Sequence, residues 1–166
     1  MQRVGGIERS PEPVELRGLA HETLEVLEQT AVQKGIGVRN LIAPGLWVQA
    51  DRHMLETVIR NLTGNALKFT PRGGQVTLAA QADGAVVTVS VKDTGIGISQ
   101  ADVAKLFRLD AQHSTLGTEK ERGSGLGLII CKEMVEQNGG RITVESEVGA
   151  GTTVQFTIPR ATRPSS

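Results

Sequence analysis

Cysteine is nearly absent from this sequence, and so are long apolar runs. The single cysteine, Cys131, excludes an internal disulfide framework and a cysteine-built metal site. No apolar run approaches the roughly 20 residues that a membrane-spanning helix needs. Residues 1–13 are mixed and polar, unlike the basic-then-apolar order of a signal peptide. We therefore expect a soluble, cytoplasmic domain that makes no direct membrane contact.

The sequence also lacks an excess of charge of either sign. Its 18 basic and 18 acidic residues cancel, so no global field attracts nucleic acid or an anionic membrane. We expect no nucleic-acid partner. A chain of 166 residues is long enough for one domain with a buried hydrophobic core and too short for two domains of typical size.

Hydrophobic periodicity divides the chain into helices and strands. Gly35 is placed to end a first helix, and Asp51 is placed to cap a second one that stops before Pro71. Ala82 to Gly84 form a turn signal between two alternating segments. The predicted helices are 14–34, 51–69 and 126–137, and the predicted strands are 36–42, 46–49, 75–80, 85–92, 141–146 and 152–158. This pattern predicts an α+β two-layer sandwich, in which three helices cover a mixed, mostly antiparallel sheet.

A long polar stretch lies between Gly97 and Gly123 and is interrupted only by the segment 103–107. Segments of this length without regular structure are usually functional or disordered. We interpret this stretch as a lid over a binding site.

Two asparagines stand on the second predicted helix. Asn61 and Asn65 are four residues apart, so they project from the same face, with Lys68 near that face. Asparagine is a poor residue for a helix interior, which implies that these two asparagines have a role other than stabilising the helix. Amide oxygens suit Mg²⁺ together with phosphate oxygens. On the helix alone, a solvated or capping asparagine pair would be the simpler interpretation.

Asp93 ends an apolar strand and is followed by Gly95 and Gly97, where the backbone can turn sharply against a bound ring. A carboxylate only accepts hydrogen bonds, so it suits the exocyclic amine of adenine and not the carbonyl of guanine. The segment Asp93-Thr94-Gly95 also occurs in aspartic proteases. That alternative needs two carboxylates sharing a proton, which only a homodimer would supply here.

A second glycine-rich segment, Gly123 to Leu128, opens the third predicted helix. A helix N-terminus offers free N–H groups and a positive dipole end to phosphate. The segment lacks the glycine that a dinucleotide fingerprint needs where Leu128 stands, and no P-loop lysine motif occurs in the chain. The segment is informative because it follows the Asn65 and Asp93 motifs in the sequence.

Four ordered motifs together resemble those of sensor histidine kinases. Asn61 to Thr70 resembles their N box, Asp93 to Gly97 their first glycine box, Leu106 to Arg108 their F box, and Gly123 to Leu128 their second glycine box. The resemblance covers nearly all of 14–159. It implies the Bergerat (GHKL-type) ATP-binding fold of the catalytic domain, with ATP and Mg²⁺ as cofactors.

The resemblance also implies a role for each matching residue. Asn65 would coordinate Mg²⁺ with help from Asn61, Lys68 would contact phosphate, and Asp93 would read adenine. Arg108, or the lid cations Lys120 and Arg122, would reach the terminal phosphate. Either Thr152 or Thr153 would support Asp93. The remaining residues that would bind or enclose the nucleotide are Phe69, Gly95, Gly97, Ile98, Phe107, Gly123, Gly125, Leu126, Gly127 and Leu128.

Asn61 separates possible activities within this superfold. Gyrase-like and chaperone ATPases typically carry a glutamate there, which activates water, and asparagine cannot act as that base. Phosphoryl transfer to a protein is therefore favoured over hydrolysis. In histidine kinases the acceptor is a histidine on a separate dimerisation hairpin, and a response regulator then receives the phosphoryl group. His21 lacks the expected proline context, so we interpret it as a helix surface residue.

We therefore expect a catalytic domain without its acceptor, with little autophosphorylation on its own. Residues 1–13 would be a linker or the end of the hairpin, 14–160 the catalytic domain, and 161–166 a disordered tail. The full-length kinase can be membrane-anchored. Two alternatives remain: a stand-alone serine kinase of the anti-sigma-factor type, and a non-catalytic nucleotide-binding module.

Overall fold

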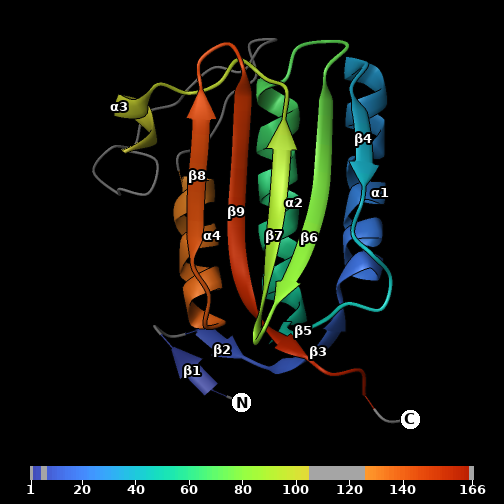
Figure 1. Ribbon diagram of the computed structural model, residues 1–166, viewed down its shortest axis with the longest axis vertical. Coiled ribbons are helices and arrows are strands. Elements are labelled where there is room, and N and C mark those ends of the chain that lie inside the picture. Colours follow the sequence, from blue (N-terminus) through green and yellow to red (C-terminus); the bar gives the residue numbers. More distant parts are fainter. Residues whose placement is uncertain (1, 5–6, 105–125, 165–166) are drawn as a thin grey trace.

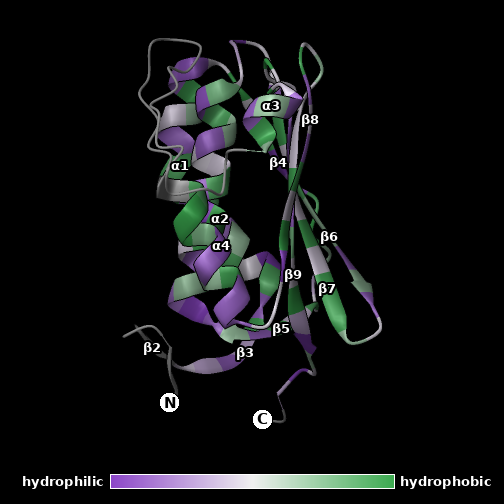
Figure 2. Cartoon of the chain, turned by 90° about the vertical axis from the view of Figure 1, so that its left-hand side faces the viewer, coloured by the Kyte–Doolittle hydropathy of each residue, from purple (hydrophilic) through white to green (hydrophobic). Residues whose placement is uncertain are grey.

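The computed structural model describes residues 2–4, 7–104 and 126–164, and these form two layers. Helices α1 (Leu16–Lys34), α2 (Arg52–Phe69) and α4 (Leu126–Gln137) lie side by side on one face of a sheet (Figure 1). Figure 2 shows the helical layer and the sheet edge-on, with the short helix α3 (Gln100–Val103) near one end. The architecture is the two-layer α+β sandwich that the sequence predicts.

The main sheet has seven strands within the described part of the chain. Their order is β3-β5-β9-β7-β6-β4, and β8 pairs with β9. Only β4 and β6 pair in parallel, so the sheet is mixed and mostly antiparallel, as predicted. The strands are β3 (Pro11–Glu15), β4 (Gly37–Asn40), β5 (Trp47–Asp51), β6 (Gln75–Asp83), β7 (Val86–Asp93), β8 (Ile142–Glu147) and β9 (Gly151–Ala161), while β1 (Gln2–Val4) and β2 (Ile7–Arg9) form a separate hairpin.

Local capping explains where the helices begin and end. At the start of α2, Asp51 Oδ1 accepts the Met54 N–H at 3.0 Å, and this satisfies one of the free donors of the first turn. At its other end, Lys34 Nζ donates to the carbonyls of Leu67 and Lys68, both at 2.8 Å. A cation there complements the negative end of the helix dipole. Gly35 ends α1 in the left-handed conformation, at φ 69°.

The core lies between the two layers. On β7, Val87, Val89 and Val91 are almost fully buried against the helices, and the alternate residues face the other side of the sheet. Ile59 and Leu62 on the inner face of α2 are also almost fully buried. The apolar stripe of α2 therefore holds this helix against the middle of the sheet, with its last turn next to the end of β7.

Four described elements were not predicted: the paired strands β1 and β2, strand β3 and helix α3. Strand β3 lies partly within 1–13, which the sequence suggests is a linker, and it pairs antiparallel with β5. Pro11 and Pro13 hide this strand in the sequence, but an edge strand tolerates prolines because it needs no ladder donor on its free side. Helix α3 was not predicted; Ser99 Oγ caps it by accepting the Asp102 N–H at 3.2 Å.

None of the helices in 2–4, 7–104 and 126–164 is long and apolar enough to cross a membrane.

Candidate functional site

A cavity of about 350 Å³ lies where β7 ends, between the C-terminal half of α2, the chain after β7 and the start of β9. Its size is within the range of small-molecule sites, and its wall is mainly apolar with few polar groups. The described residues that line it are Leu62, Asn65, Ala66, Phe69, Val91, Asp93, Ile96, Gly97, Ile98, Ser99, Asp102, Leu128, Val144, Val148, Thr152 and Val154.

Asp93 supplies the buried carboxylate of this cavity. The residue is 6% exposed, and its Oδ1 accepts the N–H of Gly95 at 2.8 Å and of Thr152 at 3.2 Å. Burial raises the pKa of this carboxyl group above its ordinary value, while the two backbone hydrogen bonds act in the opposite direction. Among the described residues both hydrogen bonds go to Oδ1, so Oδ2 remains as an acceptor for a ligand.

Three glycines allow the backbone to close around Asp93. A Cβ at Gly95 would collide with the carbonyl oxygen of Phe69, and one at Gly151 would collide with the carbonyl oxygen of Asp93 itself. Gly97 has φ 76°, and a Cβ there would collide with the carbonyl oxygen of Glu147. These positions therefore require glycine for close backbone packing, and the predicted roles of Gly95 and Gly97 in shaping a base pocket stay predictions.

A hydroxyl pair ties the segment after β7 to the β8–β9 turn. Ser146 Oγ accepts the Ile98 N–H at 2.7 Å, lies 3.1 Å from the Gly151 carbonyl oxygen, and lies 2.7 Å from Thr152 Oγ1. Thr152 lines the cavity and bonds to Asp93, whereas Thr153 is not among the residues that line this cavity. Of the two threonines that the sequence left open, Thr152 is therefore the one beside Asp93.

Only some of the predicted site residues on α2 line the cavity. Asn65 and Phe69 line it, and the Phe69 carbonyl accepts the Ile96 N–H at 3.1 Å. Asn61 instead hydrogen-bonds to the thiol of Cys131 on α4. Burial raises the pKa of that thiol to about 11, although the bond to Asn61 lowers it.

Lys68 lies over the ring of Phe69, a residue that lines the cavity. Lys68 is 7% exposed, and its Nζ lies 5.1 Å from the centroid of the Phe69 ring. Neither Lys68 nor Asn61 is among the described residues that line the cavity. Their predicted contacts with phosphate and metal remain predictions, and so do those of Asn65.

Other predicted site residues can be followed only in part. Phe107, Arg108, Gly123 and Gly125 lie outside the described residues, as do Lys120 and Arg122. Leu126 and Gly127 form the first positions of α4, and Leu128 lines the cavity. The first turn of α4 therefore borders the same cavity.

Sequence reasoning missed two residues that shape the site. Gly151, at φ 114°, packs against Asp93, and Ser146 links the chain after β7 to the β8–β9 turn. The Gly149-Ala150-Gly151 turn was a usable signal for the first of these. No sequence signal distinguishes Ser146 from other polar strand residues, because its role depends on a register that brings it opposite Thr152.

The two-layer architecture is the Bergerat (GHKL-type) fold. Residues 50–162 match the family described as histidine kinase-, DNA gyrase B-, and HSP90-like ATPase. The chain belongs to this ATP-binding family.

Two curated relatives are similar to most of this chain. Histidine protein kinase DivJ of Caulobacter vibrioides is 43% identical over 141 residues, which are 84% of this chain and 23% of DivJ. Sensor histidine kinase WalK of Bacillus subtilis is 40% identical over 138 residues, which are 82% of this chain and 23% of WalK. The chain thus spans about a quarter of the length of these relatives.

Solved structures of histidine kinases share the fold. Full-length ShkA in complex with AMPPNP has a TM-score of 0.79 and 35% identity, covering 96% of this chain and 33% of ShkA. The nucleotide-free catalytic domain of ThkA has a TM-score of 0.77 and 26% identity, covering 93% of this chain and 97% of that domain. A complex of ThkA with response regulator protein TrrA has a TM-score of 0.77 and 25% identity, covering 94% of this chain and 44% of ThkA.

Proposed function

We propose that this chain is the catalytic domain of a sensor histidine kinase, which binds Mg-ATP and transfers the γ-phosphoryl group to a histidine on a separate dimerisation hairpin. The observation that carries the proposal is the buried carboxylate of Asp93, which keeps one oxygen for a ligand at a mainly apolar cavity. A flat aromatic ring whose faces pack on apolar side chains and whose edge carries one exocyclic amine complements that arrangement, and adenine is such a ring.

The other parts of the nucleotide would extend from this cavity toward α2 and the start of α4. Asn65 lines the cavity and carries an amide oxygen, a hard ligand that suits Mg²⁺. No cluster of three or more His, Cys, Asp or Glu side chains that could hold a metal occurs in the described ranges, so the ion would depend on Asn65, phosphate oxygens and water. On the same helix, Asn61 would assist Asn65, and Lys68 would contact phosphate.

Transfer to a protein acceptor is consistent with an amide at position 61, because asparagine cannot deprotonate an attacking water. Positioning and charge neutralisation by Mg²⁺ would then provide most of the rate enhancement. The hairpin of the same kinase would be the direct partner, and a response regulator would receive the phosphoryl group from it. The similarity of this chain to histidine kinases supports this assignment.

Two measurements test the proposal. Calorimetry with ATP and GTP in the presence of Mg²⁺ should show binding of ATP with strong preference over GTP. Addition of the dimerisation hairpin of the same kinase and γ-labelled ATP should then give acid-labile, base-stable label on the hairpin. The label should be lost in Asn65→Asp and Asp93→Asn.

Each other product would identify a different activity. Acid-stable label would indicate a hydroxyl kinase, free phosphate without label would indicate an ATPase, and bound but uncleaved ATP would indicate a nucleotide sensor. Any of the three would overturn histidine phosphorylation as the function. Failure to bind ATP at all would overturn the assignment of the cavity.

A further inference from the structure

A second cavity, of about 380 Å³, lies between α1 and the edge strand β4, and Thr63 of α2 is among its lining residues. We call it the α1–β4 groove. Leu24 and Leu27 of α1 and Val38 of β4 give it apolar walls. It shares no lining residue with the cavity at Asp93. Its volume is within the range of small-molecule sites.

Thr63 gives this groove an unused polar group. The residue is fully buried, and its hydroxyl has no hydrogen-bond partner within the described part of the chain. Two other helical threonines donate to the carbonyl four residues earlier: Thr23 to Leu19 at 2.8 Å, and Thr57 to His53 at 2.9 Å. Because a buried hydroxyl without a partner is unfavourable, Thr63 is a ready hydrogen-bonding site for a molecule in the groove.

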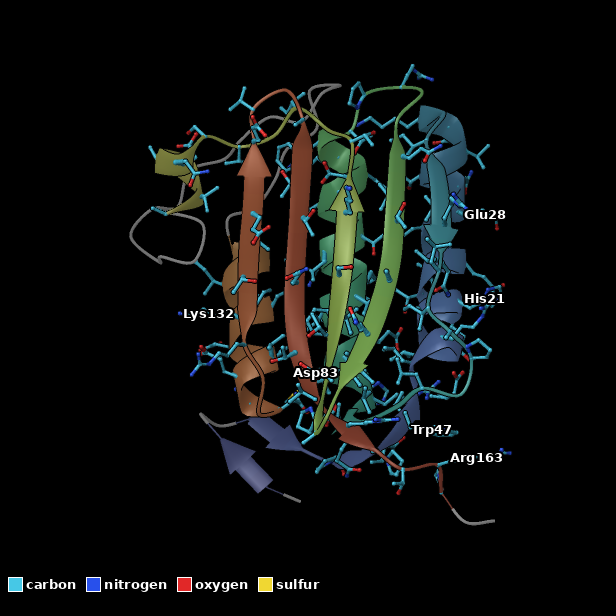
Figure 3. All side chains as sticks on the ribbon, viewed as in Figure 1. His21, Glu28, Trp47, Asp83, Lys132 and Arg163 are labelled. Carbon is cyan, nitrogen blue, oxygen red and sulfur yellow. The ribbon has the colours of Figure 1, made fainter. Side chains whose placement is uncertain are left out.

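The mouth of the groove is acidic. Glu25 and Glu28 of α1 line it, and His21 Nε2 lies 3.4 Å from Glu25 Oε1. Figure 3 shows the His21 and Glu28 side chains projecting from α1 at the same edge of the molecule as β4. Two exposed carboxylates favour a cation at this position, although solvent screening keeps each contribution small.

We propose that the α1–β4 groove binds a small amphipathic amine. The apolar body would lie between Leu24, Leu27 and Val38, a hydroxyl group would bond to Thr63, and the ammonium group would face Glu25 and Glu28. Thr63, which lines this groove, follows Leu62 and stands two residues before Asn65, and both of those residues line the cavity at Asp93. The proposal does not depend on the phosphotransfer activity.

Tyramine is a suitable probe because it carries a phenol at one end and an ammonium group at the other. Titration of the ¹⁵N-labelled chain should shift the amide signals of α1, β4 and Thr63, with a dissociation constant in or below the low millimolar range. Phenethylamine, which lacks the phenol hydroxyl, should bind roughly five-fold more weakly, because one hydrogen bond is lost. The acid 3-(4-hydroxyphenyl)propionate should bind more weakly than tyramine because its charge is reversed.

Thr63→Val keeps the side-chain shape and removes the hydroxyl. This variant should bind tyramine and phenethylamine equally, whereas the control Thr57→Val on the same helix should keep the preference for tyramine. Thermal unfolding should confirm that both variants are folded.

Absence of shifts in α1 and β4 would overturn the proposal, since tyramine would then not bind in the groove. Shifts confined to β7 and β9 would place the probe in the nucleotide cavity and would overturn it too. A preference for tyramine that persists in Thr63→Val would contradict the role of the hydroxyl.

Discussion

Asp51 and Asp93 are two buried aspartates that serve different ends of the same helix. Asp51 stands immediately before α2, and Asp93 lies near its last turn, about 27 Å away along an 18-residue helix. They are 7% and 6% exposed, respectively. Each accepts two backbone N–H bonds: Asp51 from Met54 at 3.0 Å and Ser10 at 2.8 Å, and Asp93 from Gly95 and Thr152.

The difference lies in how the carboxylate oxygens are used. Asp51 engages Oδ1 with Met54 and Oδ2 with Ser10, so both oxygens hold the fold together. Asp93 receives both bonds on Oδ1 and lines a cavity. Burial and the number of hydrogen bonds therefore do not distinguish these two aspartates. The distribution of the bonds over the two oxygens does, and so does the cavity, which of the two only Asp93 lines.

The largest effect is expected where the backbone packs directly on Asp93. Gly151→Ala should lower the free energy of unfolding by about 3 kcal/mol, because the new Cβ meets the Asp93 carbonyl oxygen at a φ of 114°. Gly149→Ala, two residues away, should cost only about 1 kcal/mol, because φ is 84° but nothing lies within 4 Å of the new Cβ. Urea unfolding of the two variants measures the difference. Equal losses would mean that close packing on Asp93 is unimportant.

The next effect separates the two aspartates by function. Asp93→Asn should weaken ATP binding roughly 10- to 100-fold, because the amide NH₂ must face either the adenine amine or the N–H groups of Gly95 and Thr152. Calorimetric titration with ATP measures the loss.

Asp51→Asn is the matched control. It should lower the free energy of unfolding by about 1 kcal/mol, because its NH₂ would face the Ser10 N–H, but it should leave ATP affinity unchanged. A loss of ATP affinity in Asp51→Asn comparable to that in Asp93→Asn would show that the two carboxylates do not differ as proposed.

A smaller effect should appear in the pH dependence of stability. Because burial raises the pKa of Asp93 in the folded state, the folded chain retains this proton where the unfolded chain has lost it. Its contribution to stability therefore falls as pH rises from the ordinary value of 3.8 through the folded pKa.

The stability of wild type relative to Asp93→Asn should accordingly decline over that window and level off above it. Urea unfolding of both proteins from about pH 4 to pH 7 tests this. A relative stability that rises with pH would mean that the hydrogen bonds to Oδ1 outweigh burial.

The smallest effect concerns Trp47, the only tryptophan. It begins β5, the strand that ends at Asp51, and lies at the end of the molecule opposite the C-terminus of β7 (Figure 3). ATP binding at Asp93 should therefore leave its emission maximum unchanged. A clear shift on addition of ATP would indicate that the Asp51 end responds to the nucleotide.

Much of the fold could be predicted because local signals and tertiary packing agree. Asp51 caps α2, Gly35 ends α1, and the valines of β7 alternate into the core, as their spacing indicates. Strand β3 escaped prediction because Pro11 and Pro13 are poor strand residues wherever both edges are paired. Only its position at the edge of the sheet makes it possible.

The candidate site was predictable to a similar extent. Asn65, Asp93 and Gly97 belong to ordered motifs, and the structure brings them to one cavity. Asn61 carries the same motif signal, yet it bonds to Cys131 on α4. Sequence spacing places two side chains on one helix face, but it does not decide which neighbouring element each contacts.

The sequence by itself indicated the three long helices, most strands of the main sheet, and an acceptor carboxylate among glycines. The helices and strands depend on caps, turns and periodicity among residues close together in the chain. Only the tertiary structure decided that Thr152 and not Thr153 bonds to Asp93, that Ser146 links the chain after β7 to Thr152, and that Thr63 has no hydrogen-bond partner among the described residues. Each of these depends on strand register or helix packing, which joins residues far apart in the chain.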